Sequence, residues 1–89
     1  MKLRFILNPR SGRNASRPWL SAFIRDFIAA RSLDAELAVT THPGHATALA
    51  CAALDAGCDR IVAIGGDGTM NEVAQALVST PAAHAHVSD

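Results

Sequence analysis

The sequence has few aromatic residues, two cysteines, no long apolar run and no net charge. Aromatic residues make up 4% of the chain and hydrophobic residues 49%, so alanine supplies much of the apolar content. This composition excludes a disordered chain and predicts a globular core built from small side chains. With 89 residues, the chain is one small domain or part of one.

The two cysteines, Cys51 and Cys58, stand seven positions apart, which is not the CxxC spacing of a metal or redox site. We expect reduced thiols in a cytosolic protein. Because no run of 18 apolar residues occurs, no membrane-spanning helix is expected. The N-terminus lacks the apolar segment of a signal peptide, which favours a cytoplasmic location.

Charge is divided unevenly along the chain. Residues 1–31 hold seven basic residues against Asp26, a net charge of +6, and residues 32–89 carry the opposite −6. Solvated faces that compensate one another would explain most of this pattern. Three arginines cluster after the first apolar run, however, and they could meet either a polyphosphate or an anionic membrane surface: Arg10, Arg13 and Arg17.

Three short apolar runs predict strands at residues 3–7, 35–40 and 60–64, each followed by a polar or glycine-rich loop. Helices are expected from Ser16, which could cap the first of them, over 45–56, and from Met70 to about residue 79. The apolar stripe of the first helix is expected to be core: Trp19, Leu20, Phe23, Ile24, Phe27 and Ile28. Residues 81–89 lack periodicity and are expected to be a loose tail after a domain of residues 1–80.

The predicted order β-α-β-α-β-α indicates an α/β fold with three layers and a parallel sheet. In such a sheet, the loops that leave the carboxyl ends of the strands lie along one edge, where ligands bind. The loops at residues 8–12, 40–44 and 65–71 should therefore lie together.

The segment Ile61–Glu72 carries the strongest chemical signal, because a strand runs through a glycine-rich turn into a helix. Such a turn suits phosphate, since free N–H groups and the positive end of the helix dipole point toward the ligand. The turn matches neither GxxxxGK[ST] nor GxGxxG. Asp67 would repel phosphate unless it holds a metal ion or a sugar hydroxyl, and carboxylate–Mg²⁺–phosphate is the usual solution.

Other polar residues of these loops have two readings each. Thr69 could bind phosphate or cap the third helix, and Asn71 and Glu72 could contact a ligand or compensate the helix dipole. The pair His42 and His45 lacks a third ligand for a metal site. Thr47 is expected to be structural.

Three motifs, in order, resemble the diacylglycerol kinase catalytic-domain family, which includes bacterial lipid kinases and sphingosine and ceramide kinases. They are Asn8-Pro9-Arg10-Ser11-Gly12, Gly44-His45-Ala46 and Gly65-Gly66-Asp67-Gly68-Thr69-Met70-Asn71-Glu72. The likeness extends to about Val78. The family continues with a further strand, a Pro-x-Gly-Thr-x-Asn-Asp motif and a β-rich domain, and we expect none of these before Asp89. The resemblance therefore implies an N-terminal fragment of such a kinase.

This resemblance implies ATP-dependent phosphorylation of a lipid hydroxyl with Mg²⁺. Asn8, Pro9, Arg10, Ser11 and Gly12 would border the nucleotide, and Thr40 would contact the adenosine part. The phosphates would lie against Gly65, Gly66, Asp67, Gly68, Thr69, Met70 and Asn71, with Asp67 as the catalytic residue near the metal ion.

The resemblance also implies partners and a location. The partners would be a nucleotide and a lipid substrate, with peripheral contact at the inner membrane surface, and no nucleic acid. The fragment alone would be inactive, because phosphoryl transfer also needs an acceptor and a base. The alternatives are an NAD kinase-like enzyme, or a non-enzymatic fragment that forms a homodimer through an exposed sheet edge.

Overall fold

A computed structural model describes residues 1–78 and the strand at 84–88. Its helices and strands alternate along the chain, as expected. They are β1 (Leu3–Leu7), the 3₁₀ helix η1 (Gly12–Ser16), α1 (Leu20–Ala30), β2 (Ala35–Val39), α2 (His45–Asp55), β3 (Arg60–Ile64), α3 (Asp67–Val78) and β4 (His84–Ser88). The fold is α/β with a parallel sheet, which confirms the predicted class.

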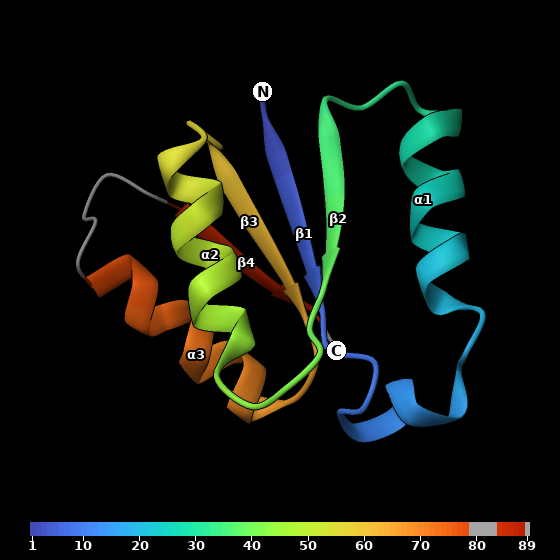
Figure 1. Cartoon of the computed structure of the whole chain (residues 1–89). Coiled ribbons are helices and arrows are strands. Elements are labelled where there is room, and N and C mark those ends of the chain that lie inside the picture. Colours follow the sequence, from blue (N-terminus) through green and yellow to red (C-terminus); the bar gives the residue numbers. More distant parts are fainter. Residues whose placement is uncertain (79–83, 89) are drawn as a thin grey trace.

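The four strands are parallel and lie in the order β2-β1-β3-β4. Figure 1 shows α1 on one side of this sheet and α2 with α3 on the other, which gives the three predicted layers. The connection after β1 leads to one edge of the sheet, and the connection after β3 leads to the other. Between β1 and β3 the two loops diverge, and this switch point is where open α/β sheets bind ligands.

The core lies between the sheet and the pair α2 and α3. Alternate strand residues Ile6, Ile61 and Ala63 point into it, because successive side chains of a strand face opposite sides. They meet a helix surface of small side chains: Ala46, Ala50 and Ala53 from α2, and Val73 and Ala76 from α3. Alanine lets the helices lie close to the sheet, so the prediction of a small-residue core is confirmed.

The prediction for the first helix was wrong in two respects. The chain first forms η1, in which the Ser16 hydroxyl donates to the Arg13 carbonyl at 2.9 Å, and α1 begins only at Leu20. The predicted core stripe is also divided, because Ile24 is buried whereas Trp19, Phe23 and Phe27 are exposed. Helix α1 packs mainly on the edge strand β2, so only one side of its apolar stripe is covered.

The C-terminal residues correct a further expectation. Residues 84–88, which were assigned to a loose tail, form β4 and pair in register with β3, Arg60 opposite His84 through Ile64 opposite Ser88. The additional strand that the resemblance placed outside this chain is therefore present. Residues 79–83 and 89 lie outside the described residues. Within the described part of the chain, no helix combines the length and apolarity that crossing a bilayer requires.

Candidate functional site

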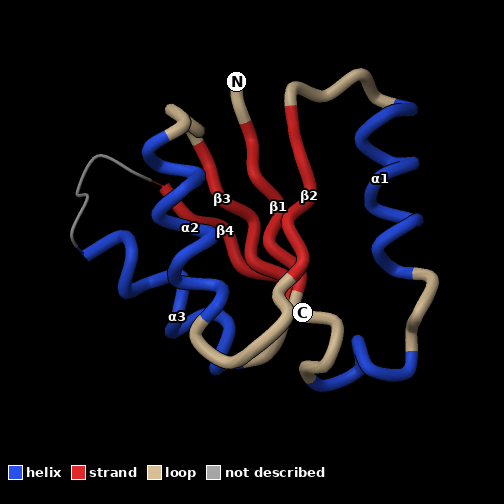
Figure 2. Tube along the Cα trace, in the orientation of Figure 1, coloured by secondary structure: helices blue, strands red, loops and turns tan. Residues whose placement is uncertain are grey.

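The three βα loops meet at one end of the sheet, as Figure 2 shows in tan below the red strands. Two backbone hydrogen bonds hold the ends of the strands in place. The Asn8 amide donates to the Ile64 carbonyl at 2.9 Å, and the Thr40 amide donates to the Leu7 carbonyl at 2.9 Å. Asn8, Thr40 and Gly65 are thereby fixed side by side where the strands end.

Side chains of the first loop reach the third loop through Thr69, whose side chain is buried. The Asn8 amide nitrogen Nδ2 donates to Thr69 Oγ1 at 3.2 Å, and Ser11 Oγ lies 3.3 Å from the same oxygen. Because α3 already begins at Asp67, Thr69 lies within the first helical turn. Its hydroxyl therefore joins the two loops, and it does not cap the helix.

Asn14 provides a second link that the sequence did not reveal. It is 6% exposed, and its Nδ2 donates to the carbonyl oxygens of Asn8 at 3.0 Å and of Ile64 at 3.5 Å. These carbonyls belong to the ends of β1 and β3, on either side of the switch point. Asn14 thus fixes η1 against both strand ends, and no sequence motif marked it because its partners are backbone atoms.

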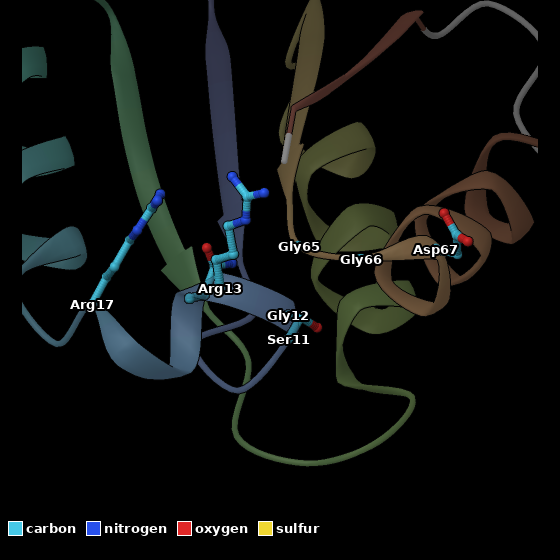
Figure 3. Close-up of a pocket in the computed structure, with 8 residues that line it drawn as sticks. Ser11, Gly12, Arg13, Arg17, Gly65, Gly66 and Asp67 are labelled. Carbon is cyan, nitrogen blue, oxygen red and sulfur yellow. The ribbon is translucent and has the colours of Figure 1, made fainter.

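A cavity of about 440 Å³ lies between η1 and the glycine-rich turn. Figure 3 shows Arg13 and Arg17 on one side of it and Asp67 on the other. We call it the arginine-side cavity, and it is lined by Ser11, Gly12, Arg13, Asn14, Arg17, Gly65, Gly66 and Asp67. Two guanidinium groups, three glycines and a helix N-terminus give it the character of an anion site, with one carboxylate at its rim.

A second cavity of about 240 Å³ lies on the other side of Ser11. We call it the histidine-side cavity, and it is lined by Asn8, Arg10, Ser11, Thr40, Thr41, His42, Pro43, Gly68, Thr69 and Glu72. It lies between all three loops. Ser11 lines both cavities, so they adjoin at this residue.

The structure brings together most of the predicted site residues. Gly12, Gly65, Gly66 and Asp67 line the arginine-side cavity, and six others line the histidine-side cavity: Asn8, Arg10, Ser11, Thr40, Gly68 and Thr69. Pro9, Met70 and Asn71 line neither of these cavities. Thr41 and Pro43 line the site although the sequence did not single them out, whereas Arg13 and Arg17 belong to the arginine cluster for which polyphosphate was one of two expected partners.

Glu72 lines the histidine-side cavity and also has a structural role. Its Oε1 accepts a hydrogen bond from the Ala46 amide at the start of α2, at 3.2 Å. The Thr47 hydroxyl donates to the Glu72 carbonyl at 2.7 Å, which confirms a structural role for Thr47. A carboxylate at the N-terminus of α2 compensates the dipole of that helix.

The two histidines of the second loop stack on each other. Their ring centroids lie 4.4 Å apart at an interplanar angle of 13°, and Thr41 Oγ1 lies within hydrogen-bond distance of Nδ1 of both rings. Across residues 1–78, no cluster of three metal-ligating side chains occurs.

A parallel sheet whose switch point carries a glycine-rich strand–helix turn is typical of proteins that bind nucleotide phosphates. The model of the diacylglycerol kinase catalytic domain matches residues 2–88. The chain therefore belongs to this family, and the predicted resemblance is confirmed.

Two curated relatives agree with the family. The chain is 40% identical over 77 residues to "Putative lipid kinase YtlR" of Bacillus subtilis, covering 82% of this chain and 24% of the relative. It is 34% identical over 79 residues to sphingoid long-chain bases kinase 1 of Arabidopsis thaliana, covering 88% of this chain and 10% of the relative. The chain thus spans about a quarter or less of these proteins.

A solved structure shares the fold. A protein from Bacillus anthracis, described as "a putative diacylglycerol kinase", superposes with a TM-score of 0.74 at 26% identity. The match covers 97% of this chain and 29% of that structure. The architecture described above is therefore that of a segment within diacylglycerol kinase-like proteins.

Proposed function

We propose that this chain binds Mg-ATP at the junction of its three βα loops, as the nucleotide-binding part of a kinase that phosphorylates a lipid hydroxyl. The observation that carries the proposal is the contact of Asn8 and Ser11 with Thr69. It joins the first and third loops at the switch point, with one cavity on each side of Ser11. The membership in a family of lipid kinases supplies the reaction class.

The adenosine part of the nucleotide is assigned to the histidine-side cavity. Thr40, which is 8% exposed, and Asn8 supply polar atoms there, and Thr41, His42 and Pro43 form the outer wall. A nucleoside needs a few polar groups beside an apolar surface, and this lining offers both. The sequence resemblance had assigned Thr40 to the same part of the nucleotide.

The phosphates are assigned to the arginine-side cavity. Gly65 and Gly66 expose backbone next to it, α3 begins at Asp67, and Arg13 and Arg17 supply positive charge. Arginine pairs well with phosphate because its planar guanidinium can donate two hydrogen bonds at once. The choice left open by the sequence, polyphosphate or membrane, is resolved in this proposal for Arg13 and Arg17 in favour of polyphosphate.

The residues at this cavity also fit Mg²⁺ bound together with the nucleotide. Mg²⁺ takes one or two carboxylates and completes its shell with phosphate oxygens and water. Asp67 is the exposed carboxylate at the cavity rim. When bound, Mg²⁺ would neutralise phosphate charge during transfer.

The reaction itself depends on positioning and electrostatics, because the transferred phosphoryl group needs little covalent help from protein. In this proposal Asn8, Ser11 and Thr69 fix the loops, and Arg13 and Arg17 stabilise charge on the phosphates. We assign the lipid acceptor pocket and the general base to the part of the longer relatives that the 89 residues do not match. The 89 residues alone are therefore expected to bind nucleotide without transferring phosphate. We propose the cytoplasm, or the cytoplasmic surface of the membrane, as the location.

Calorimetric titration of Mg-ATP and of ATP with EDTA tests the assignment. Asp67→Ala should weaken Mg-ATP binding about tenfold, because the carboxylate acts through the metal ion. The same change should strengthen the binding of metal-free ATP, because without a metal ion the carboxylate repels phosphate. Gly66→Val should weaken both, because its side chain occupies the cavity. The controls are Asp55→Ala, at the end of α2, and Ala74→Val, on the exposed side of α3. Equal affinity in all five proteins would refute the site.

A further inference from the structure

Glu72 lines the histidine-side cavity from α3 and is the acidic residue of its lining. It lies four positions after Gly68, on the same face of the helix, and Gly68 lines the cavity too. The side chain is neither fully buried nor fully exposed. A carboxylate accepts hydrogen bonds and donates none. A ligand group next to Glu72 must therefore bring hydrogen-bond donors.

The Glu72 side chain is held in place from the start of α2. Its Oε1 accepts the hydrogen bond from the Ala46 amide at 3.2 Å, and the Thr47 hydroxyl donates to its backbone carbonyl at 2.7 Å. Figure 1 shows the loop that leads into α2 passing beside the first turns of α3. A carboxylate has two oxygens with about four acceptor positions, and the Ala46 amide occupies one of them. The others remain for a ligand.

The charge of Glu72 limits which part of a nucleotide can lie next to it. Within residues 1–78, no lysine or arginine forms an ion pair with Glu72, since the ion pair of this segment joins Arg4 to Glu36. An unpaired carboxylate repels phosphate. The phosphates, however, are assigned to the arginine-side cavity, on the other side of Ser11. A neutral group with hydroxyl hydrogens fits the surroundings of Glu72.

We propose that Glu72 accepts hydrogen bonds from the ribose hydroxyls of the nucleotide and makes the site selective for ribonucleotides. Glu72 is five residues after Asp67, which places it about 7.5 Å along the axis from the start of α3. Its side chain leans back toward that start, because helical side chains tilt toward the N-terminus. This inference rests on the proposed function, because it requires the adenosine part to lie in the histidine-side cavity.

The order of the groups in a nucleotide favours the ribose over the base as the partner of Glu72. The phosphates are assigned to the start of α3, the ribose is joined directly to them, and the base lies beyond the ribose. The two neighbouring hydroxyls of a ribose also match the two oxygens of a carboxylate. Acidic side chains bind ribose hydroxyls in the same way in dinucleotide-binding α/β folds.

Calorimetric titration with the magnesium complexes of ATP, 2′-deoxy-ATP and 3′-deoxy-ATP tests this inference. The wild-type chain should bind at least one of the deoxy analogues about tenfold or more weakly than ATP, because a hydrogen bond to a charged group is lost. Glu72→Ala should bind ATP and both analogues alike. Glu72→Gln should show an intermediate preference, because its amide oxygen can still accept from Ala46 and a neutral hydrogen bond is weaker.

Thr47→Ala is the matched control for the structural role of Glu72. It removes the hydrogen bond to the Glu72 carbonyl and leaves the carboxylate in place. Loosened packing between α2 and α3 should weaken the binding of all three nucleotides by the same factor. The ratio of their affinities should therefore stay as in the wild type. A merely structural role of Glu72 would likewise leave this ratio unchanged in Glu72→Ala.

Three results would overturn the inference. The wild-type chain could bind ATP and both deoxy analogues alike, a result that needs no variant to fold. The preference for ATP could persist in Glu72→Ala. Glu72→Ala could instead change the preference for ATP over ITP, which lacks the amino group of adenine, and this would assign the carboxylate to the base. Absence of ATP binding would refute the proposed function together with this inference, whereas ATP binding without a ribose preference would overturn this inference alone.

Discussion

The hydroxyl oxygen of Thr69 lies 2.5 Å from the place that a Cβ atom on Gly65 would occupy. Gly65 is therefore required by the close approach of α3 to the end of β3, and its backbone conformation is an ordinary one for any residue. The same hydroxyl binds the first loop through Asn8 and Ser11. A larger residue at position 65 would push away the atom that joins the two loops.

Gly65→Ala should thus destabilise the fold by about 1–3 kcal/mol, the usual cost of overpacking a tight site. Urea unfolding followed by circular dichroism would measure this change. Gly68→Ala is the matched control, because an added Cβ there meets no atom within 4 Å. A Gly65→Ala protein as stable as the Gly68→Ala protein would contradict the tight packing of Thr69 on Gly65.

Asn14→Leu should lower both the stability of the fold and the affinity for nucleotide. The loss of its two hydrogen bonds should cost about 0.5–1.5 kcal/mol for each bond, since the carbonyls of Asn8 and Ile64 keep their backbone partners. Asn14→Asp should be worse, because a carboxylate would face two carbonyl oxygens. Denaturation and Mg-ATP titration of each variant would test this ranking. Ile6→Val, a core change of similar cost, should leave the affinity unchanged.

Arg13→Gln combined with Arg17→Gln should discriminate between nucleotides by their number of phosphates. If both guanidinium groups face the phosphates, ATP affinity should fall by about tenfold or more while AMP affinity changes little. Competition of ATP and AMP for a fluorescent nucleotide would measure both values. Arg25→Gln, on the far side of α1 from the cavity, serves as the control. An equal loss for ATP and AMP would argue against the assignment of phosphates to the arginine-side cavity.

Glu72→Gln should destabilise the packing of α3 on α2 by about 0.3–1 kcal/mol, because a neutral amide compensates the dipole of α2 less well than a carboxylate. Glu72→Ala should cost more, since it also removes the acceptor of the Ala46 amide. Thermal unfolding of both variants would rank them. Full stability of Glu72→Ala would show that the contact between Glu72 and α2 is unimportant.

The first three strands and the three helices could be predicted because each is marked locally. Leu3–Leu7 and Arg60–Ile64 are apolar runs that end at turn residues, and the alanines of α2 follow the helical period. The strand His84–Ser88 is different. It holds a single β-branched apolar residue, Val87, and it becomes a strand by pairing with β3, which its own sequence does not encode.

The surroundings of α1 explain the other errors. Periodicity identified an amphipathic helix, but the number of buried residues depends on how wide a surface the sheet offers to it. An edge strand offers little, so Ile24 is buried while Trp19 and Phe23 are not. Similarly, Asn8, Thr69 and Asp67 belong to recognisable motifs and Arg17 to a visible cluster of arginines. Asn14 joins the site through the path of η1, which no sequence pattern predicted.

The place of β1 in the middle of the sheet has a consequence for the order of folding. Its two neighbours, β2 and β3, begin at Ala35 and Arg60. Along the chain, η1 and α1 lie between β1 and β2, and β2 and α2 lie in addition between β1 and β3. Parallel pairing of this kind requires the closure of long loops, and the entropy lost in loop closure precedes the favourable contacts between the strands. Folding is slow for this reason. During synthesis on the ribosome, β1 cannot pair with β3 until Ile64 has emerged. The loops that follow β1 and β3 can meet at the candidate site only after that point.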